Sequence, residues 1–112
     1  MSVYGNENLA FGRQMQFLTV DGTSDTVELP AGLEAVDLTC DVAVYVNIGR
    51  PGETPVAAAP GAEKTEADGQ YLLANQTYSY PLPMSTDAKK VKIAAIQVSS
   101  GGTLRINYRA LS

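Results

Sequence analysis

The sequence predicts an all-β protein, a sandwich or a barrel, of about eight strands. No segment of useful length shows the 3.6-residue apolar period of an amphipathic helix. Short alternating or β-branched runs occur instead, and clusters of Gly, Pro, Asp and Ser separate them. Strands with frequent turn residues between them are typical of antiparallel sheet proteins.

The clearest of the expected strands is Val42–Ile48, in which valine or isoleucine occupies every even position. A period of two places one face of such a strand in a core. Pro81 and Pro83 suit a strand at a sheet edge, where no ladder donor is needed. In chain order, the expected strands are Gln14–Val20, Asp25–Leu29, Ala35–Leu38, Val42–Ile48, Tyr71–Leu73, Thr77–Leu82, Val91–Val98 and Leu104–Ala110.

The last two strands are expected to form a tight hairpin around residues 100–102, because Ser-Gly-Gly is a favourable three-residue loop. Gly102 would take the left-handed conformation there. This register pairs Ile96 with Ile106 in the core and leaves Arg105 on the opposite face.

The chain of 112 residues fits one domain. We expect an N-terminal arm over residues 1–12 and a single β domain over residues 13–112. Within it, residues 49–70 are rich in Ala, Pro and Gly and offer little to bury, so we expect a long loop. We expect no membrane segment, because no apolar run approaches the roughly 20 residues that span a bilayer.

Composition argues against an enzyme. The chain has no histidine, which removes the commonest general base and the commonest zinc ligand. No nucleophile elbow or phosphate-binding glycine motif occurs. Twelve acids always offer carboxylate pairs, but solvated surface acids explain them better. The one cysteine, Cys40, is expected to be a buried structural thiol.

We expect no metal and no cofactor. Calcium is the one ion worth weighing, since Glu63, Glu66 and Asp68 lie close together in the long loop. They do not follow the Asp-x-Asp-x-Asp-Gly pattern, and Lys64 lies among them. Six tyrosines could form a sugar platform or a protein interface, although half-buried rim positions explain each one as well: Tyr4, Tyr45, Tyr71, Tyr78, Tyr80 and Tyr108.

Charge is unevenly distributed along the chain. Residues 1–70 carry eleven acids and three bases, a net charge of −8, whereas residues 71–112 carry one acid and five bases, a net charge of +4. Five cations without interleaved aromatic residues, in a net acidic chain, argue against nucleic acid. They fit a salt-bridged contact with an acidic protein neighbour better.

Four segments resemble small virion proteins of tailed bacteriophages, in particular capsid decoration (cement or staple) proteins. The likeness covers about residues 36–110 and rests on Asp41–Gly49, Tyr71–Pro83, Lys92–Gln97 and Ser100–Tyr108. The resemblance implies a jelly-roll-like antiparallel β-sandwich of about eight strands that forms dimers or trimers. It also implies a structural role at junctions between capsid subunits. No binding residue can be carried over from the family.

The predicted function is therefore that of a structural virion protein that binds the major capsid protein on the capsid exterior and stabilises contacts between subunits. Assembly would take place in the host cytoplasm. The alternative is a carbohydrate- or receptor-binding module of a phage tail or fibre. The candidate partner-binding residues are of two kinds: apolar side chains outside the expected core, and cations of the loops and the last strand. They are Leu9, Phe11, Arg50, Val56, Lys89, Arg105 and Arg109.

Overall fold

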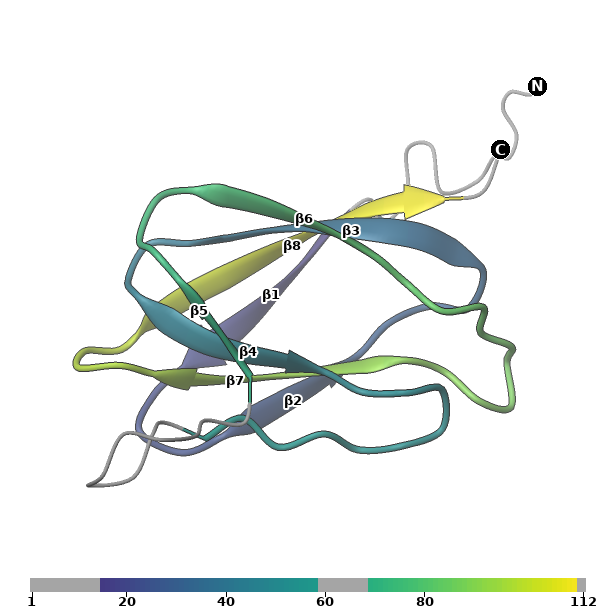
Figure 1. Ribbon diagram of the computed structural model, residues 1–112, viewed down its shortest axis with the longest axis horizontal. Coiled ribbons are helices and arrows are strands. Elements are labelled where there is room, and N and C mark those ends of the chain that lie inside the picture. Colours follow the sequence, from purple (N-terminus) through teal and green to yellow (C-terminus); the bar gives the residue numbers. More distant parts are fainter. Residues whose placement is uncertain (1–14, 59–68, 111–112) are drawn as a thin grey trace.

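The computed structural model describes residues 15–58 and 69–110, and within these ranges it contains β-strands and no helix (Figure 1). It follows that no helix in these ranges is long and apolar enough to cross a membrane. All eight expected strands are present, with ends shifted by up to a few residues. They are β1 (Met15–Val20), β2 (Asp25–Glu28), β3 (Leu33–Cys40), β4 (Val44–Ile48), β5 (Gln70–Leu72), β6 (Thr77–Pro81), β7 (Lys92–Gln97) and β8 (Gly102–Ala110).

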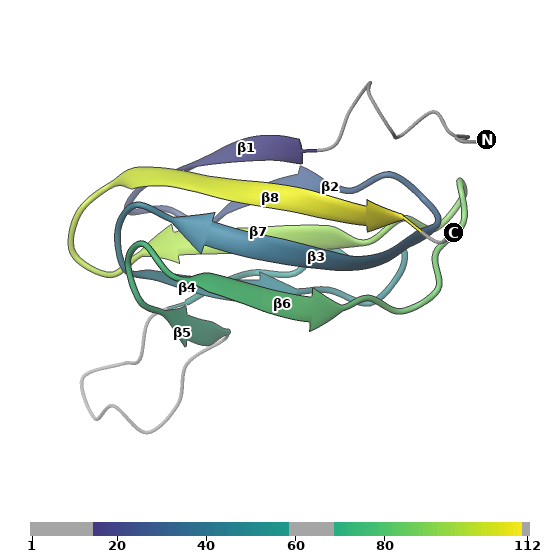
Figure 2. The same ribbon diagram turned by 90° about the horizontal axis from the view of Figure 1, so that it is seen from above.

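The strands form two four-stranded sheets that pack face to face (Figures 1 and 2). Sheet A has the order β1-β8-β3-β6 and sheet B the order β2-β7-β4-β5, and the neighbouring strands in both sheets run antiparallel. Two four-stranded sheets with this interleaved order make a jelly roll. The predicted fold class is confirmed.

The core lies between the sheets and follows the period of two in the strands. On β4, Val44 and Val46 are buried, as their alternation predicted. Cys40 is buried at the end of β3, and burial raises the pKa of its thiol. Each fully buried aliphatic side chain contributes about 1.5–3 kcal/mol of hydrophobic free energy. Other members of the core are Val20, Leu29, Leu33, Val36, Leu38, Leu72, Val91, Ile93, Ala95, Leu104 and Ile106.

The expected C-terminal hairpin is wrong. β7 pairs with β2 and β4 in sheet B, whereas β8 pairs with β1 and β3 in sheet A, so residues 98–101 cross from one sheet to the other. Ile106 is buried as predicted, but Ile96 lies on the outer face of sheet B, opposite Tyr45. The reason is that β7 is apolar on both faces: Ile93, Ala94 and Ala95 are all fully buried, so alternation did not reveal which face meets the core.

The first part of the expected long loop belongs to the folded body. Ala57 is 1% exposed, and its backbone N–H donates to Ser24 Oγ at 3.0 Å. Asn47 Nδ2 donates to the carbonyl of Val56 at 3.0 Å, and Lys92 Nζ donates to Thr54 Oγ1 at 3.1 Å. Residues 49–58 therefore cover part of the outer face of sheet B. This cover explains why the outward-facing Ala94 is fully buried.

Candidate functional site: two binding surfaces

The outer face of sheet A carries mostly polar side chains. Its cross-strand rows follow from the register. In one row Phe17 lies opposite Arg105, which lies opposite Thr39. Phe17 is 62% exposed, which is unusual for a large aromatic side chain in a sheet. Met15, 44% exposed, begins the next row.

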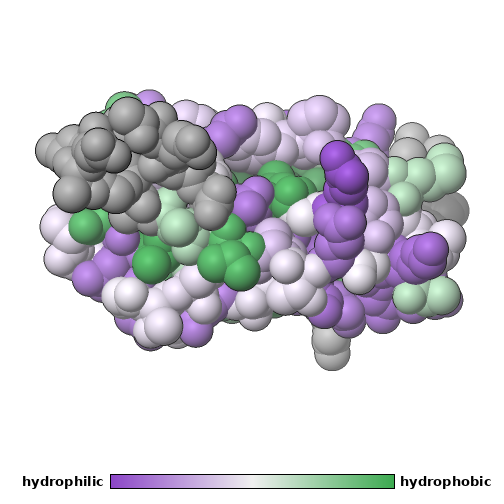
Figure 3. Space-filling model, turned by 60° about the horizontal axis from the view of Figure 1, so that its bottom comes forward, coloured by the Kyte–Doolittle hydropathy of each residue, from purple (hydrophilic) through white to green (hydrophobic). Residues whose placement is uncertain are grey.

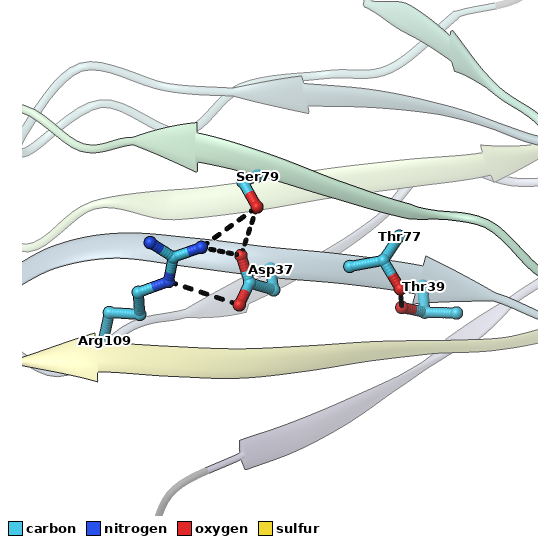
Figure 4. A network of polar contacts seen from close by, with 5 residues as sticks. All are labelled: Asp37, Thr39, Thr77, Ser79 and Arg109. Atoms are coloured by element: carbon cyan, nitrogen blue, oxygen red, sulfur yellow. Dashed lines mark hydrogen bonds and ion pairs between the residues drawn. The ribbon is translucent and has the colours of Figure 1, made fainter.

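A polar network crosses three strands of this face (Figure 4). Arg109 on β8 forms a bidentate ion pair with Asp37 on β3: Nη2 lies 2.8 Å from Oδ1, and Nε lies 3.3 Å from Oδ2. Ser79 on β6 donates to Asp37 Oδ1 and accepts from Arg109 Nη2 at 3.1 Å. The hydrogen bonds from Arg109 and then from Ser79 lower the pKa of the Asp37 carboxyl. The hydrogen bonds of these three side chains therefore link β3, β6 and β8 across the face of the sheet.

A shallow hollow of about 180 Å³ lies beside this network on the same face. Three strands and two turns supply its walls, which are Phe17, Thr39, Asp41, Asn75, Thr103 and Arg105. Asp41 Oδ1 accepts from the backbone N–H of Thr103 at 2.8 Å, which fixes the carboxylate at the rim. The side chain of Arg105 makes no hydrogen bond or ion pair with another described residue.

The turn that carries Asn75 holds it in a left-handed conformation, with φ of 62°. Its backbone N–H donates to the carbonyl of Cys40 at 2.7 Å, so the turn is tied to the end of β3. Asparagine is one of the few residues other than glycine that adopts this conformation readily. The side-chain amide is therefore presented at the hollow by a backbone fixed in place.

The outer face of sheet B carries a different surface. Tyr71 and Leu73 flank the buried Leu72, so their side chains point outward, and each is 48% exposed. Val98, 39% exposed, lies just after β7, and its N–H donates to the carbonyl of Ala43, directly before β4. We call Tyr71, Leu73 and Val98 the sheet B patch. Apolar side chains gather at one end of the face turned toward the viewer in Figure 3.

Aromatic and aliphatic groups support this patch from within the sheet. Tyr45 lies opposite Tyr71 and opposite Ile96 in the register. The rings of Tyr45 and Tyr71 meet edge to face, with centroids 5.5 Å apart and an interplanar angle of 67°. Edge-to-face pairs are a favoured aromatic geometry. Tyr45 on β4 therefore supports the ring of Tyr71 from the neighbouring strand.

A second hollow, of about 360 Å³, opens between the edges of the two sheets. Its walls come from the end of β4, the start of β5 and the end of β6, including Arg50, Pro81 and Pro83. The Tyr80 hydroxyl donates to Gln70 Oε1 at 2.9 Å across its floor, and burial raises the pKa of this phenol. The short β5 pairs with only the first part of β4, so the end of β4 has no neighbouring strand on that side in the described chain. The hollow lies at this place.

The structure does not bring the predicted partner-binding residues together. Arg105 and Arg109 lie on the outer face of sheet A, and Val56, 59% exposed, lies over sheet B. Arg50 and Lys89 are exposed in the loops after β4 and before β7. Leu9 and Phe11 lie outside the described residues, as do the calcium candidates Glu63, Glu66 and Asp68.

The positions of two tyrosines on β6 bear on the sugar-platform alternative. Tyr78 and Tyr80 share one face of β6, as predicted, but that face packs against the core. They are therefore half-buried rim residues of the sandwich. Within residues 15–58 and 69–110, no group of three or more acidic, cysteine or histidine side chains could hold a metal ion.

Sequence reasoning missed the residues that stand out in the structure. Phe17, Asp41 and Asn75 are far apart in the sequence and meet only through sheet A. Two signals were available: Phe17 faces opposite to the apolar Leu18 in a period-two strand, and Asn75 lies in a turn between two short strands. Neither could reveal that the two residues border the same hollow.

The fold is a jelly-roll β-sandwich in which each sheet presents an exposed outer face. No protein-family model matches the chain, and no curated protein matches it. Among solved structures, the chain is similar to a protein named PirA, with a TM-score of 0.52 and 14% sequence identity. The likeness covers 88% of this chain and 95% of PirA. At this identity it supports the fold alone.

Proposed function

We propose that this protein is a structural virion protein that docks on the exterior of a phage capsid and ties neighbouring major capsid proteins together. The observation that carries the proposal is the sheet B patch. Together with Val56, which lies over the same sheet, the outer side of sheet B holds four of the seven large apolar side chains that are exposed in the described chain. Contiguous exposed apolar surface is a common mark of a protein-binding site.

The composition of the patch favours a protein partner. Tyrosine and large aliphatic groups around a desolvated centre are the usual content of interface hot spots. None of its three side chains is charged, so docking them would bury no unpaired charge. Because residues 36–110 resemble capsid decoration proteins, we propose that the partner of this surface is a capsid protein.

A sheet face is also a suitable docking surface because it is rigid. Tyr71 is on β5, and Leu73 and Val98 directly follow β5 and β7, whose Leu72 and Ala95 are anchored in the core, so the scaffold should change little when it docks. A rigid surface loses less conformational entropy on binding than a mobile loop does. Self-association into a dimer or trimer is part of the same proposal, and light scattering of the purified protein measures it.

The test compares the parent with Leu73→Ser/Val98→Ser and with the control Met84→Ser, which changes an 84% exposed apolar residue away from the patch. Each would be co-sedimented with capsid shells of the encoding phage prepared without this protein. We expect the patch variant to bind at least about tenfold more weakly, the effect of about 1.4 kcal/mol. The control should bind like the parent, and all three should melt together.

Two results would count against the proposal. If the parent does not bind shells, the protein is not a decoration protein. If the patch variant binds as tightly as the control does, the docking surface lies elsewhere on the molecule.

A further inference from the structure

We propose that the hollow on sheet A, bordered by Phe17, Asp41, Asn75 and Arg105, binds a single uncharged sugar ring. It lies on the sheet opposite the sheet B patch, so this site would remain open when the patch is docked. The inference does not depend on capsid binding.

The polar groups of the hollow determine which chemistry can satisfy them. The Asp41 carboxylate only accepts hydrogen bonds, the Arg105 guanidinium only donates them, and the Asn75 amide does both. A ligand must therefore offer donors and acceptors close together. Neighbouring hydroxyl groups on a sugar ring do so, since each hydroxyl can donate and accept.

The charges argue for a ligand without net charge. Asp41 and Arg105 border the same small hollow and carry opposite signs. An anion such as phosphate would meet the Asp41 carboxylate and supply few donors for it. A purely apolar ligand would cover both charged groups and leave them without partners, which is costly.

Phe17 supplies the apolar part of the site. Its side chain is 62% exposed, lies in register beside Arg105 and borders the hollow. The C–H groups on one side of a pyranose form an apolar surface that can pack on an aromatic ring, while its hydroxyl groups remain at the edge. The combination of one ring and a few convergent polar groups is typical of small-ligand sites.

Size limits the ligand to about one ring. The hollow measures about 180 Å³ and is open to solvent, which is below the roughly 300–1,000 Å³ of pockets for drug-sized molecules. A monosaccharide unit, alone or at the end of a longer glycan, fits this volume class. Thr39 is less available to it, since its hydroxyl already hydrogen-bonds with that of Thr77 at 2.9 Å.

Two backbone features hold polar groups of the hollow in place. The first is Asn75, whose left-handed conformation is fixed by its hydrogen bond to Cys40. The second is Gly102, since any side chain there would overlap the Asp41 carboxylate and push it from the rim. Each feature positions one of the polar groups that the proposal uses.

The experiment titrates the full chain with methyl glycosides of glucose, galactose, mannose and N-acetylglucosamine, observed by ¹H–¹⁵N NMR. Inorganic phosphate serves as the charged comparison. We expect millimolar binding of at least one glycoside, with shifts centred on the amides of Asn75, Thr103 and Arg105. Phosphate should not reproduce these shifts.

Variants then assign the binding to the hollow. Phe17→Ser and Asn75→Gly should each weaken binding about tenfold, the equivalent of one lost favourable contact group. Asn75→Gly keeps the left-handed backbone while it removes the amide. Met15→Ser, which changes the other exposed apolar side chain of β1, is the matched control and should bind like the parent.

The proposal fails if no glycoside shifts these amides, or if Phe17→Ser and Asn75→Gly bind as well as Met15→Ser. Loss of shell binding in Phe17→Ser without any glycoside binding would also overturn it, because the hollow would then be a protein contact. Capsid shells are absent from the titration, so its failure is distinct from failure of the proposed docking function.

Discussion

Gly102 lies so close to Asp41 that a side chain at position 102 would overlap the Asp41 carboxylate. The same added carbon would also press on the Val42 side chain. The φ angle of Gly102 is not in the left-handed region, so space and not backbone conformation requires glycine here. This contact joins the β3–β4 turn to the start of β8 and positions one wall of the sheet A hollow.

Gly102→Ala should therefore destabilise the protein by about 1–3 kcal/mol, the usual cost of overpacking. Gly22→Ala is the control, because the nearest atom to its added carbon is the flexible Gln97 amide at 3.8 Å. Urea denaturation measures both. Equal midpoints for the two variants would show that the Asp41 turn can move away at little cost.

Ile106→Ala should cost about 2–5 kcal/mol, since Ile106 is completely buried between the sheets. Ile96→Ala should cost about 1 kcal/mol or less, because Ile96 lies on the outer face of sheet B and is partly exposed. Thermal or chemical melts give the ranking. Equal losses would favour the hairpin register, in which the two residues face the same core.

Asp37 should make stability depend on pH. Its folded pKa is lowered by Arg109 and Ser79, so its contribution is fully present above the unfolded pKa of about 4. The contribution is lost as pH falls through the lower folded pKa. The stability difference between the parent and Asp37→Asn should therefore be constant near neutral pH and shrink toward pH 2.

Denaturation curves of both proteins at a series of pH values measure this difference. In an Arg109→Gln background, Asp37→Asn should have a smaller effect at neutral pH, because the ion pair is already absent. The effect should be modest in every case, since the Arg109 side chain is 54% exposed. A difference that grows on acidification would contradict the lowered pKa.

Ala57→Glu should destabilise the protein, whereas Val56→Glu should not. Ala57 is 1% exposed and Val56 is 59% exposed, although they are adjacent. Burying a polar group without a partner costs about 1–3 kcal/mol, and a charge costs more. Thermal melts and hydrogen exchange of the Ala57 amide, which donates to Ser24, measure the effect.

If the two variants melt alike and the Ala57 amide stays protected, residues 49–58 do not stabilise the sandwich. The same contacts predict the effect of replacing this segment. Exchanging residues 52–58 for a Gly-Ser linker should lower stability, because the contacts with Ser24, Asn47 and Lys92 would be lost.

The sequence by itself determined the fold class and most of the strands. Where one strand face is buried and the other is not, alternation shows it directly: Val44 and Val46 on β4, and Ile106 on β8, are core residues as predicted. Turn residues between the runs placed the strands to within a few positions. Local pattern carries this information because the side-chain period of a strand is a local property.

Only the tertiary structure decided which strands pair and which residues meet. β7 is apolar on both faces because residues 49–58 cover its outer side, so its own pattern could not choose between the sheets. Arg109 on β8 forms an ion pair with Asp37 on β3, although 72 positions separate them in the sequence. This cation is therefore already paired within the chain and is less available to a partner. The sheet A hollow likewise unites β1, β8 and two turns, since long-range register, and not local periodicity, determines which side chains become neighbours.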